Sequence, residues 1–430
     1  MVIRGNELSR SAWVTTAALV VLLFMDVQLL SQSRSAQQWI GSWVSAQQEA
    51  CEPSQLPKQS FQKATLREVV HLSLGGPQIR LKLSNLFGRE PLVIRSVVVA
   101  RAKPGATGEV EKESRIRVRF NGATGVSISA GTEVTSDAIS LPTEPFSNLA
   151  VSMDFDSVPT CATSHPGARA TAFLTKGNQT TKERLKKSER FEHWYFLSGV
   201  EVTSGISIGA ITAFGDSITD GHGATTDGND RWTDVLSSRL VPHAVAVLNA
   251  GIGGNRVLLD GLGPSGISRF DRDALGPKGV RAIIILEGIN DIGMLDREKE
   301  HPQEDHDALV NQLETAMKGM VEKAHQQGVC VLGGTLMPFL GSEYYHPRQR
   351  SESDREKINE WIRTSGVFDG IVDFDKLTRD PLQPGRLATN ADSGDHLHPG
   401  PVGYRRMGEG VPLDLLTGKR CSHDSQDARN

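Results

Sequence analysis

The chain has 430 residues, and its 47 Lys and Arg residues nearly balance its 51 Asp and Glu residues, giving a formal net charge of −4. This length is sufficient for two domains with hydrophobic cores of their own, so neither a disulfide nor a metal is required to hold the fold together. The near balance of charge gives no electrostatic reason to expect a nucleic-acid partner.

The N-terminus has the pattern of an export signal. Arg4 and Arg10 precede an apolar stretch, Ala12–Met25, and polar and small residues follow it. This stretch is shorter than the roughly 20 residues that a helix needs to cross a bilayer. We therefore expect a signal peptide over residues 1–36, cleaved near Ser33–Ala36, and a secreted or periplasmic protein without a stable membrane partner. An uncleaved membrane anchor is the alternative.

Export would permit disulfides among the four cysteines, which are Cys51, Cys161, Cys330 and Cys421. Cys51 and Cys161 both lie in the N-terminal half and could pair there, but the sequence does not fix the connectivity. Cys330 lies in the run GVCVLGG, which favours a small buried side chain in a strand. No C-x-x-C spacing occurs, so a cysteine-based zinc site is not expected.

Residues 37–200 have the sequence pattern of an antiparallel β domain. Short runs rich in β-branched residues, such as TLREVVHLSL and LVIRSVVVA, are separated by Gly, Pro, Asn and Ser. In RIRVRF the residues Ile116, Val118 and Phe120 alternate with three arginines, which is the period of a strand with one buried face. We expect a β-sandwich, jelly-roll-like accessory domain here.

Residues 205–418 alternate between apolar strands and amphipathic helices. The expected strands are IGAITAF, AVAVLNA, RAIIILEG, VCVLGGTLM and GIVDF. These are continuous apolar runs, as is typical of parallel strands covered on both faces. The pattern predicts an α/β, doubly wound parallel sheet of five strands, and a disordered tail over residues 419–430.

Residues that can take part in a reaction follow these strands where each one ends. Ser217 follows the first strand in FGDSITDG, and adjacent glycines follow the second in NAGIGGNR. Asn290 follows the third in EGIND, and Asp395 and His398 lie three residues apart in DHLHP, after the fifth. Ligands of such sheets bind beyond the carboxyl ends of the strands. A hydroxyl, an imidazole, a carboxylate and neutral donors are the groups that acyl transfer through an oxyanion requires.

These four blocks, in this order, resemble those of the SGNH hydrolase superfamily, the GDSL-type esterases and lipases. The resemblance covers Gly209 to about Val411 and implies a flavodoxin-like three-layer sandwich. The β-rich half, with GSWVSAQQ and RLKLSNLFG, is similar to the N-terminal region of a group of large secreted bacterial GDSL esterases. The first block reads Gly-Asp-Ser-Ile where the family name has Leu, an apolar exchange with no chemical consequence.

The resemblance also implies roles for individual residues. Ser217 attacks the ester carbonyl, His398 transfers the proton, and Asp395 orients the imidazole. The oxyanion hole is expected from the backbone N–H of Ser217, the backbone N–H of Gly254 and the side-chain amide of Asn290. Gly253 is the alternative to Gly254, because the block has adjacent glycines. Neither a cofactor nor a metal is expected.

Four neighbouring residues receive structural interpretations. Asp216 is expected to cap or brace the nucleophile turn, and Asp291 to do the same for the asparagine loop. His396 could form a metal pair with His398, but no third ligand at suitable spacing supports that reading. His222 is expected to be a solvent-facing loop histidine, with a place in the pocket wall as the alternative.

The sequence therefore predicts a secreted serine carboxylester hydrolase for short-chain acyl or acetyl esters, acting through an acyl-enzyme. The expected partner is a small-molecule or polysaccharide ester. Alternatives are a lipid ester hydrolase of the lipase or lysophospholipase type, and a carbohydrate deacetylase guided by a carbohydrate-binding β-rich domain. Acyl transfer to an alcohol also uses the same groups. No long apolar lid segment occurs between the blocks, which favours short acyl chains.

Overall fold

The computed structural model describes residue 1 and residues 38–205 and 209–418. The predicted signal peptide, its cleavage site and the predicted disordered tail lie outside the described residues. From Trp39 onwards the described residues form one compact unit, so the boundary near residue 200 between two domains remains a prediction. No helix among them combines the length and the apolar character needed to cross a membrane.

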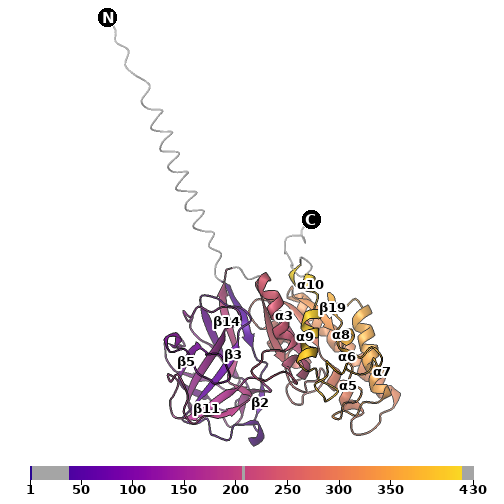
Figure 1. Ribbon diagram of the computed structural model, residues 1–430, viewed down its shortest axis with the longest axis horizontal. Coiled ribbons are helices and arrows are strands. Elements are labelled where there is room, and N and C mark those ends of the chain that lie inside the picture. Colours follow the sequence, from indigo (N-terminus) through magenta and orange to yellow (C-terminus); the bar gives the residue numbers. More distant parts are fainter. Residues whose placement is uncertain (2–37, 206–208, 419–430) are drawn as a thin grey trace. The chain divides into compact units, whose positions relative to one another are not determined.

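The β-rich half contains antiparallel sheets, as Figure 1 shows. Its strands are β1 (Gln38–Val44), β2 (Gln48–Ala50), β3 (Ala64–His71), β4 (Ile79–Asn85), β5 (Leu92–Arg101), β6 (Ile116–Arg117), β7 (Val126–Ile128), β8 (Thr132–Thr135), β9 (Asn148–Ser157), β10 (Ala162–Pro166), β11 (Ala172–Lys176), β12 (Glu189–Phe191), β13 (His193–Tyr195) and β14 (Leu197–Ser204). Two short 3-10 helices, η1 (Pro53–Gln55) and η2 (Lys112–Ser114), lie between them.

Two of these sheets enclose one core. A four-stranded sheet has the order β1-β14-β4-β8, and a larger sheet runs β12-β11-β3-β9-β5-β6 with β7 beside β5. Leu81 and Val200 of the first sheet and Leu66 and Val151 of the second belong to the same apolar cluster, and all four are fully buried. A third sheet, β13-β10-β2, completes this half.

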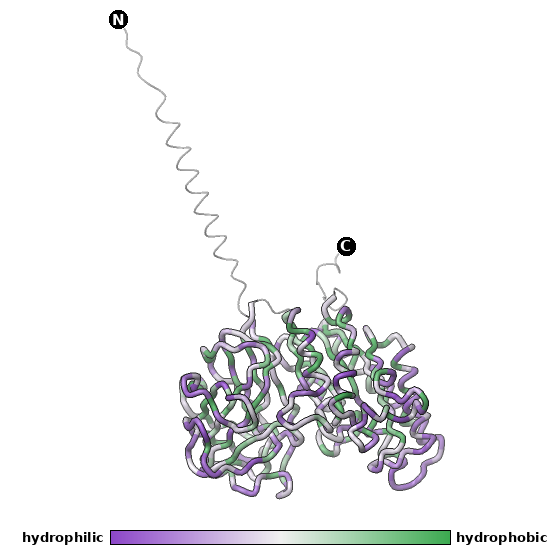
Figure 2. The backbone as a smooth tube through the Cα atoms, viewed as in Figure 1, coloured by the Kyte–Doolittle hydropathy of each residue, from purple (hydrophilic) through white to green (hydrophobic). Residues whose placement is uncertain are grey.

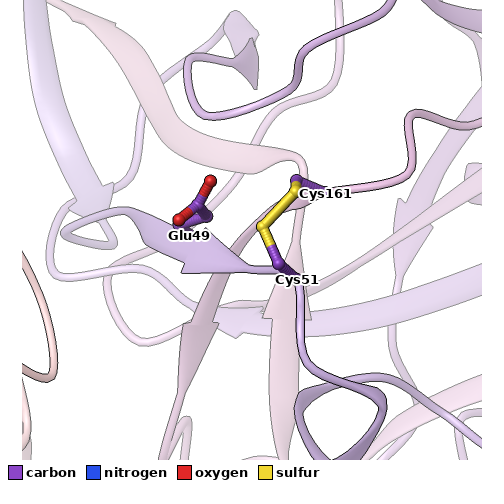
Figure 3. Close-up of side chains that lie close together, drawn as sticks. All are labelled: Glu49, Cys51 and Cys161. Carbon is purple, nitrogen blue, oxygen red and sulfur yellow. A yellow bond between two sulfur atoms is a disulfide. The ribbon is translucent and has the colours of Figure 1, made fainter.

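A disulfide joins Cys51, which follows β2, to Cys161, which precedes β10, over a sequence separation of 110 residues. Figure 3 shows this bond with the Glu49 side chain beside it. Since both sulfurs are in the disulfide, neither is a thiolate that could ligate a metal with Glu49. Cys330 is buried in the core, as expected, and it is also disulfide-bonded.

The C-terminal half is a five-stranded parallel sheet with the order β16-β15-β17-β18-β19. Its strands are β15 (Gly209–Gly215), β16 (Val245–Gly251), β17 (Val280–Leu286), β18 (Cys330–Gly334) and β19 (Gly370–Val372). Its helices are α2 (Ser217–Asp220), α3 (Trp232–Leu240), η3 (Val241–His243), α4 (Gly266–Phe270), η4 (Asp271–Leu275), α5 (Ile289–Leu295), α6 (Gln303–Gln326), α7 (Gln349–Thr364), α8 (Phe374–Thr378), α9 (Pro401–Gly410) and α10 (Leu413–Thr417).

The strands of this sheet are apolar because they are covered on both faces. Every residue of β15 and of β18 is buried, as expected for strands between layers. The two halves share packing, since Ala210 and Leu248 of the sheet belong to the apolar cluster of the β-rich half. Figure 2 shows hydrophilic segments on outer loops and hydrophobic segments running through the interior.

The register of the central strands places their carboxyl ends side by side. Gly215 of β15 pairs with Gly251 of β16 on one side and with Leu286 of β17 on the other. The loops that follow these three residues carry Ser217, the glycine block and Asn290. The candidate site is therefore built at one edge of the sheet.

Candidate active site

The turn after β15 presents Ser217 at the first position of α2. Asp216 is the N-cap, and its carboxylate accepts a hydrogen bond from the Ile218 N–H at 2.9 Å, which is the bracing role expected for it. Gly221 ends the short helix with φ +107°. A side chain at Gly215 would lie 2.2 Å from the Thr219 hydroxyl, so only glycine permits this tight turn.

Ser217, His398 and Asp395 form a continuous hydrogen-bonded chain. The Ser217 hydroxyl lies 2.7 Å from Nε2 of His398, and Nδ1 of His398 lies 2.6 Å from Oδ2 of Asp395. A carboxylate can only accept, so the imidazole carries its proton on Nδ1 and Nε2 is free to accept from the hydroxyl. Ser217 and His398 are 181 positions apart in the sequence, so only the fold brings them together.

The carboxylate of Asp395 is held in its ionised form. Burial opposes ionisation, but hydrogen bonds from the His398 ring and from the backbone N–H groups of Leu397 and His398 outweigh it and hold the pKa of Asp395 well below its usual range. The Ser393 hydroxyl donates to the same carboxylate at 3.1 Å. Asp395 is thus prepared to stabilise a positive charge on His398.

Asn290 has a fixed amide orientation beside the glycine block. Its Nδ2 donates to the backbone carbonyl of Asn255 at 2.6 Å, and its Oδ1 accepts from the hydroxyl of Tyr345 at 2.6 Å. Because the carbonyl needs a donor, the nitrogen must face Asn255, which leaves the second N–H hydrogen of Asn290 for another acceptor. Tyr345 was not predicted as part of the site, because it lies 55 residues from Asn290 in a loop after β18.

Gly254 has φ +70°, a left-handed conformation that favours glycine. A Cβ built at this position would lie 2.5 Å from Cδ1 of Leu262, so the leucine side chain packs directly on the glycine. At Gly253, the alternative oxyanion donor, a Cβ would meet no atom closer than a carboxylate oxygen of Asp220 at 3.7 Å. The choice between the two N–H groups remains a prediction.

Arg269 ties the carboxyl ends of the central strands together. This side chain is fully buried and donates to the carbonyls of Gly215 and Ala250 at 2.9 and 2.8 Å. It also donates to Asn255 at 2.7 Å and to Glu287 at 3.0 Å. The helical segment of residues 266–275 changes at this point from α4 to the π-helical turn η4, and such turns are frequent at functional sites.

Three buried carboxyl groups lie beneath the site. Burial raises the pKa of Asp216 to about 7 and that of Asp291 to about 6, and it raises the pKa of Glu287 well above its usual range. Asp291 accepts from the N–H groups of Val257 and Leu258 at 2.8 and 3.1 Å. It also accepts from its own backbone N–H, so it braces the asparagine loop and ties it to the loop after the glycine block.

His222 lies against His398 and Asp395 instead of facing only solvent. Its ring centroid is 4.1 Å from that of His398, and its Nε2 is 3.8 Å from Oδ2 of Asp395. His222 remains 49% exposed in its side chain, so the second reading, a place in the pocket wall, describes it better. His396 points elsewhere and contacts Asp392 through Nδ1 at 2.6 Å.

Among the described residues, His222, Asp395 and His398 each place one ligand atom within 4.8 Å of the others, close enough to hold a metal ion. The two ring nitrogens of His398 are already engaged, with Nε2 at the Ser217 hydroxyl and Nδ1 at Asp395. A metal would have to break one of these hydrogen bonds. The arrangement suits proton transfer between Ser217 and His398 better than metal binding.

Comparisons with known proteins match the C-terminal half. Residues 213–406 match the model of the GDSL-like Lipase/Acylhydrolase family, and no curated protein matches the chain. Similar solved structures include a lipase/acylhydrolase from Enterococcus faecalis, with 21% identity over 50% of this chain and 95% of that one, at a TM-score of 0.36. A member of the lipolytic G-D-S-L family from Veillonella parvula DSM 2008 has 18% identity over 49% and 98%, at 0.34. The acetyl xylan esterase AlAXEase has 18% identity over 47% and 96%, also at 0.34.

Proposed function

Since the C-terminal half of this chain is a GDSL-like lipase/acylhydrolase domain, and thus a carboxylic ester hydrolase, we propose that the protein is a secreted serine esterase for short-chain acyl or acetyl esters. The observation that carries the proposal is the chain of hydrogen bonds from Ser217 through His398 to Asp395, at 2.7 and 2.6 Å. A serine hydroxyl hydrogen-bonded to an imidazole that a carboxylate orients is the arrangement for nucleophilic attack on an acyl carbon.

In the proposed reaction, Oγ of Ser217 attacks the ester carbonyl carbon while Nε2 of His398 accepts the hydroxyl proton. The resulting oxyanion is stabilised by the N–H of Ser217, the N–H of Gly254 and the amide of Asn290. The carbon–oxygen bond to the alcohol then breaks, and His398 returns the proton to the leaving alcohol. Water, activated by the same imidazole, hydrolyses the acyl-enzyme and restores Ser217.

The proposal of a short acyl chain is supported by the surface next to Gly254. Leu262, whose Cδ1 would lie 2.5 Å from a Cβ at Gly254, is 62% exposed in the loop between β16 and α4. One exposed leucine provides a small apolar surface for an acyl group, whereas a long acyl chain needs a more extended one. The sequence between the four blocks also lacks a long apolar lid segment.

Export is the part of the proposal that rests on the N-terminal sequence. The disulfide between Cys51 and Cys161 supports it, because such bonds persist in oxidising compartments outside the cytosol. The protein recovered from the periplasm or the medium is then expected to begin near residues 34–37. An intact N-terminus on the recovered protein would contradict signal cleavage.

The test is a panel of p-nitrophenyl esters from acetate to palmitate, together with acetylated xylan and a lysophospholipid. We expect the highest kcat/KM for acetate to butyrate, and complete loss of the acyl-enzyme burst in Ser217→Ala. A variant Ser217→Ala that hydrolyses p-nitrophenyl acetate as fast as the parent would overturn the assignment of the nucleophile. Preference for palmitate or lysophospholipid would replace the short-chain proposal by the lipid one, and preference for acetylated xylan would support the carbohydrate alternative.

A further inference from the structure

One side chain of the β-rich half reaches the catalytic residues. Arg169 lies in the loop between β10 and β11, and its Nη2 is 2.9 Å from Nδ1 of His222. His222 in turn lies in the loop after α2, five residues beyond Ser217. The contact therefore connects the β-rich half to the neighbourhood of the nucleophile.

The loop that carries Arg169 is held in place by its backbone. The carbonyl of Ala168 accepts from the guanidinium of Arg231 at 2.5 Å, and the carbonyl of Arg169 accepts from the N–H of Asp227 at 2.9 Å. The carboxylate of Asp227 also accepts from the N–H and the hydroxyl of Thr171 at 2.7 and 2.6 Å. Arg169 itself has φ +48°, a conformation that these contacts fix. The side chain thus starts from a defined position.

His222 is fixed as firmly on the other side. Its N–H donates to the carbonyl of Ser217 at 2.8 Å, and its carbonyl accepts from the Tyr404 hydroxyl at 2.6 Å. Its ring lies over the His398 ring, with centroids 4.1 Å apart, and its Nε2 faces Oδ2 of Asp395 at 3.8 Å. A change in the charge of His222 would be felt by both catalytic partners.

The contact with Arg169 determines the tautomer of His222. A guanidinium has only N–H donors, so Nδ1 of His222 must be an unprotonated acceptor. The neutral ring then carries its hydrogen on Nε2, the nitrogen that faces Asp395. Protonation of His222 would place a hydrogen on Nδ1 against the guanidinium, breaking the hydrogen bond and opposing two positive charges.

We propose that Arg169 is a positioning residue of the ester hydrolase: it holds His222 neutral, with its N–H towards Asp395, so that the carboxylate remains available to His398. The inference rests on the proposed function for its consequence in catalysis. It assigns the β-rich half a part in the catalytic centre, because the loop between β10 and β11 supplies a group that the C-terminal half lacks at this position.

The charged surroundings of His222 agree with this role. The groups that act on it are His398, Arg169, Asp395 and Asp220, of which the first two oppose a positive charge and the carboxylates favour one. Burial lowers the pKa of His222 to about 4, and His398 and Arg169 act in the same direction. A protonated His222 would compete with His398 for Asp395 and would oppose the imidazolium that forms when His398 accepts the serine proton.

The direct test is a titration of His222 by NMR in protein labelled at histidine Cε1, assigned with His222→Asn. In the parent, His222 is expected to remain neutral down to about pH 4. In Arg169→Met its midpoint is expected to rise by about one unit or more, towards the ordinary histidine value of about 6.5. Arg169→Lys, which keeps the charge, is expected to show a smaller rise. The matched control is Arg119→Met, which removes an exposed arginine that contacts the Gly122 carbonyl, and it should leave the midpoint unchanged.

An unchanged His222 midpoint in Arg169→Met and Arg169→Lys would overturn the proposal. This titration does not depend on ester hydrolysis, so its outcome is separate from that of the proposed function. The catalytic consequence is read from kcat/KM at pH 4.5 and pH 8.5: if the His222 midpoint rises from about 4 to about 5, Arg169→Met should lose about threefold more at the lower pH. The difference should vanish in the His222→Asn background. An equal loss at both pH values, or a difference that persists in His222→Asn, would contradict the proposed action through His222.

Discussion

The two halves of this protein use buried polar side chains for different purposes. In β17 the residues Ala282–Leu286 are almost completely buried and apolar, and a buried carboxyl group, Glu287, comes where the strand has ended. In β3 of the β-rich half, Arg67 and Glu68 are fully buried within the strand itself. Arg67 donates to the carbonyls of Gly108 and Lys182 at 2.8 and 2.6 Å.

This difference between the two halves shows which buried polar residues in a sequence indicate an active site. In a parallel sheet covered on both faces, polar groups gather beyond the strand ends, so a polar residue there indicates chemistry. In the antiparallel half a buried polar residue indicates only that backbone groups nearby need a partner. We therefore expect changes in the C-terminal site to reduce activity far more than stability, and changes in the β-rich half to do the reverse, with Arg169 as the exception.

The largest effect on activity is expected from Asn290→Ala in the C-terminal half. Removal of one oxyanion donor costs roughly 3–4 kcal/mol of transition-state stabilisation, about a hundred- to a thousandfold in kcat. KM should change little, because the amide is expected to act on the transition state. The midpoint of thermal unfolding should fall moderately, because the Asn255 carbonyl and the Tyr345 hydroxyl lose their partner. Steady-state kinetics with p-nitrophenyl acetate and a thermal melt measure both. A variant that keeps its kcat would show that Asn290 does not contact the oxyanion.

The double change Cys51→Ser and Cys161→Ser tests the other half. Loss of a disulfide that closes 110 residues should reduce the free energy of unfolding by about 2–4 kcal/mol, since the unfolded chain regains freedom. Below the unfolding transition, kcat should stay near that of the parent, because the disulfide lies between β2 and β10 and contacts no catalytic residue. Urea unfolding followed by fluorescence, with activity measured in parallel, decides this. Loss of activity in the still-folded variant would contradict the division between the halves.

A smaller effect is expected from Tyr345→Phe. The hydroxyl of Tyr345 holds Oδ1 of Asn290, and loss of a buried hydrogen bond of this kind costs about 1 kcal/mol. We expect a fall of roughly five- to tenfold in kcat with KM nearly unchanged. In the Asn290→Ala background the same change should have no further effect on kcat, because its target is gone. Equal factors in both backgrounds would mean that Tyr345 acts independently of Asn290.

The sequence predicted the catalytic half well because its signals are local. Each of the five apolar runs became a strand within a few residues, since burial on both faces demands continuous apolar residues. Asp395 and His398 lie three apart, and one short loop brings them into contact. In the β-rich half, RIRVRF kept its alternation, with Val118 and Phe120 buried, but only Ile116–Arg117 pair as a strand. Alternation reports burial, whereas pairing depends on a neighbouring strand that the run does not specify.

By itself, then, the sequence determined the order of strands and helices, the family resemblance and the residues at each strand end, because these depend on neighbours along the chain. Only the tertiary structure decided that Tyr345 holds Asn290, that Arg269 joins three strand ends, and that Arg169 reaches His222. The contacts of Tyr345 with Asn290, of Arg269 with Gly215 and of Arg169 with His222 each join residues more than 50 positions apart. A polar side chain gives no local sign of its distant partner, since any loop of suitable length could bring a donor to the same acceptor.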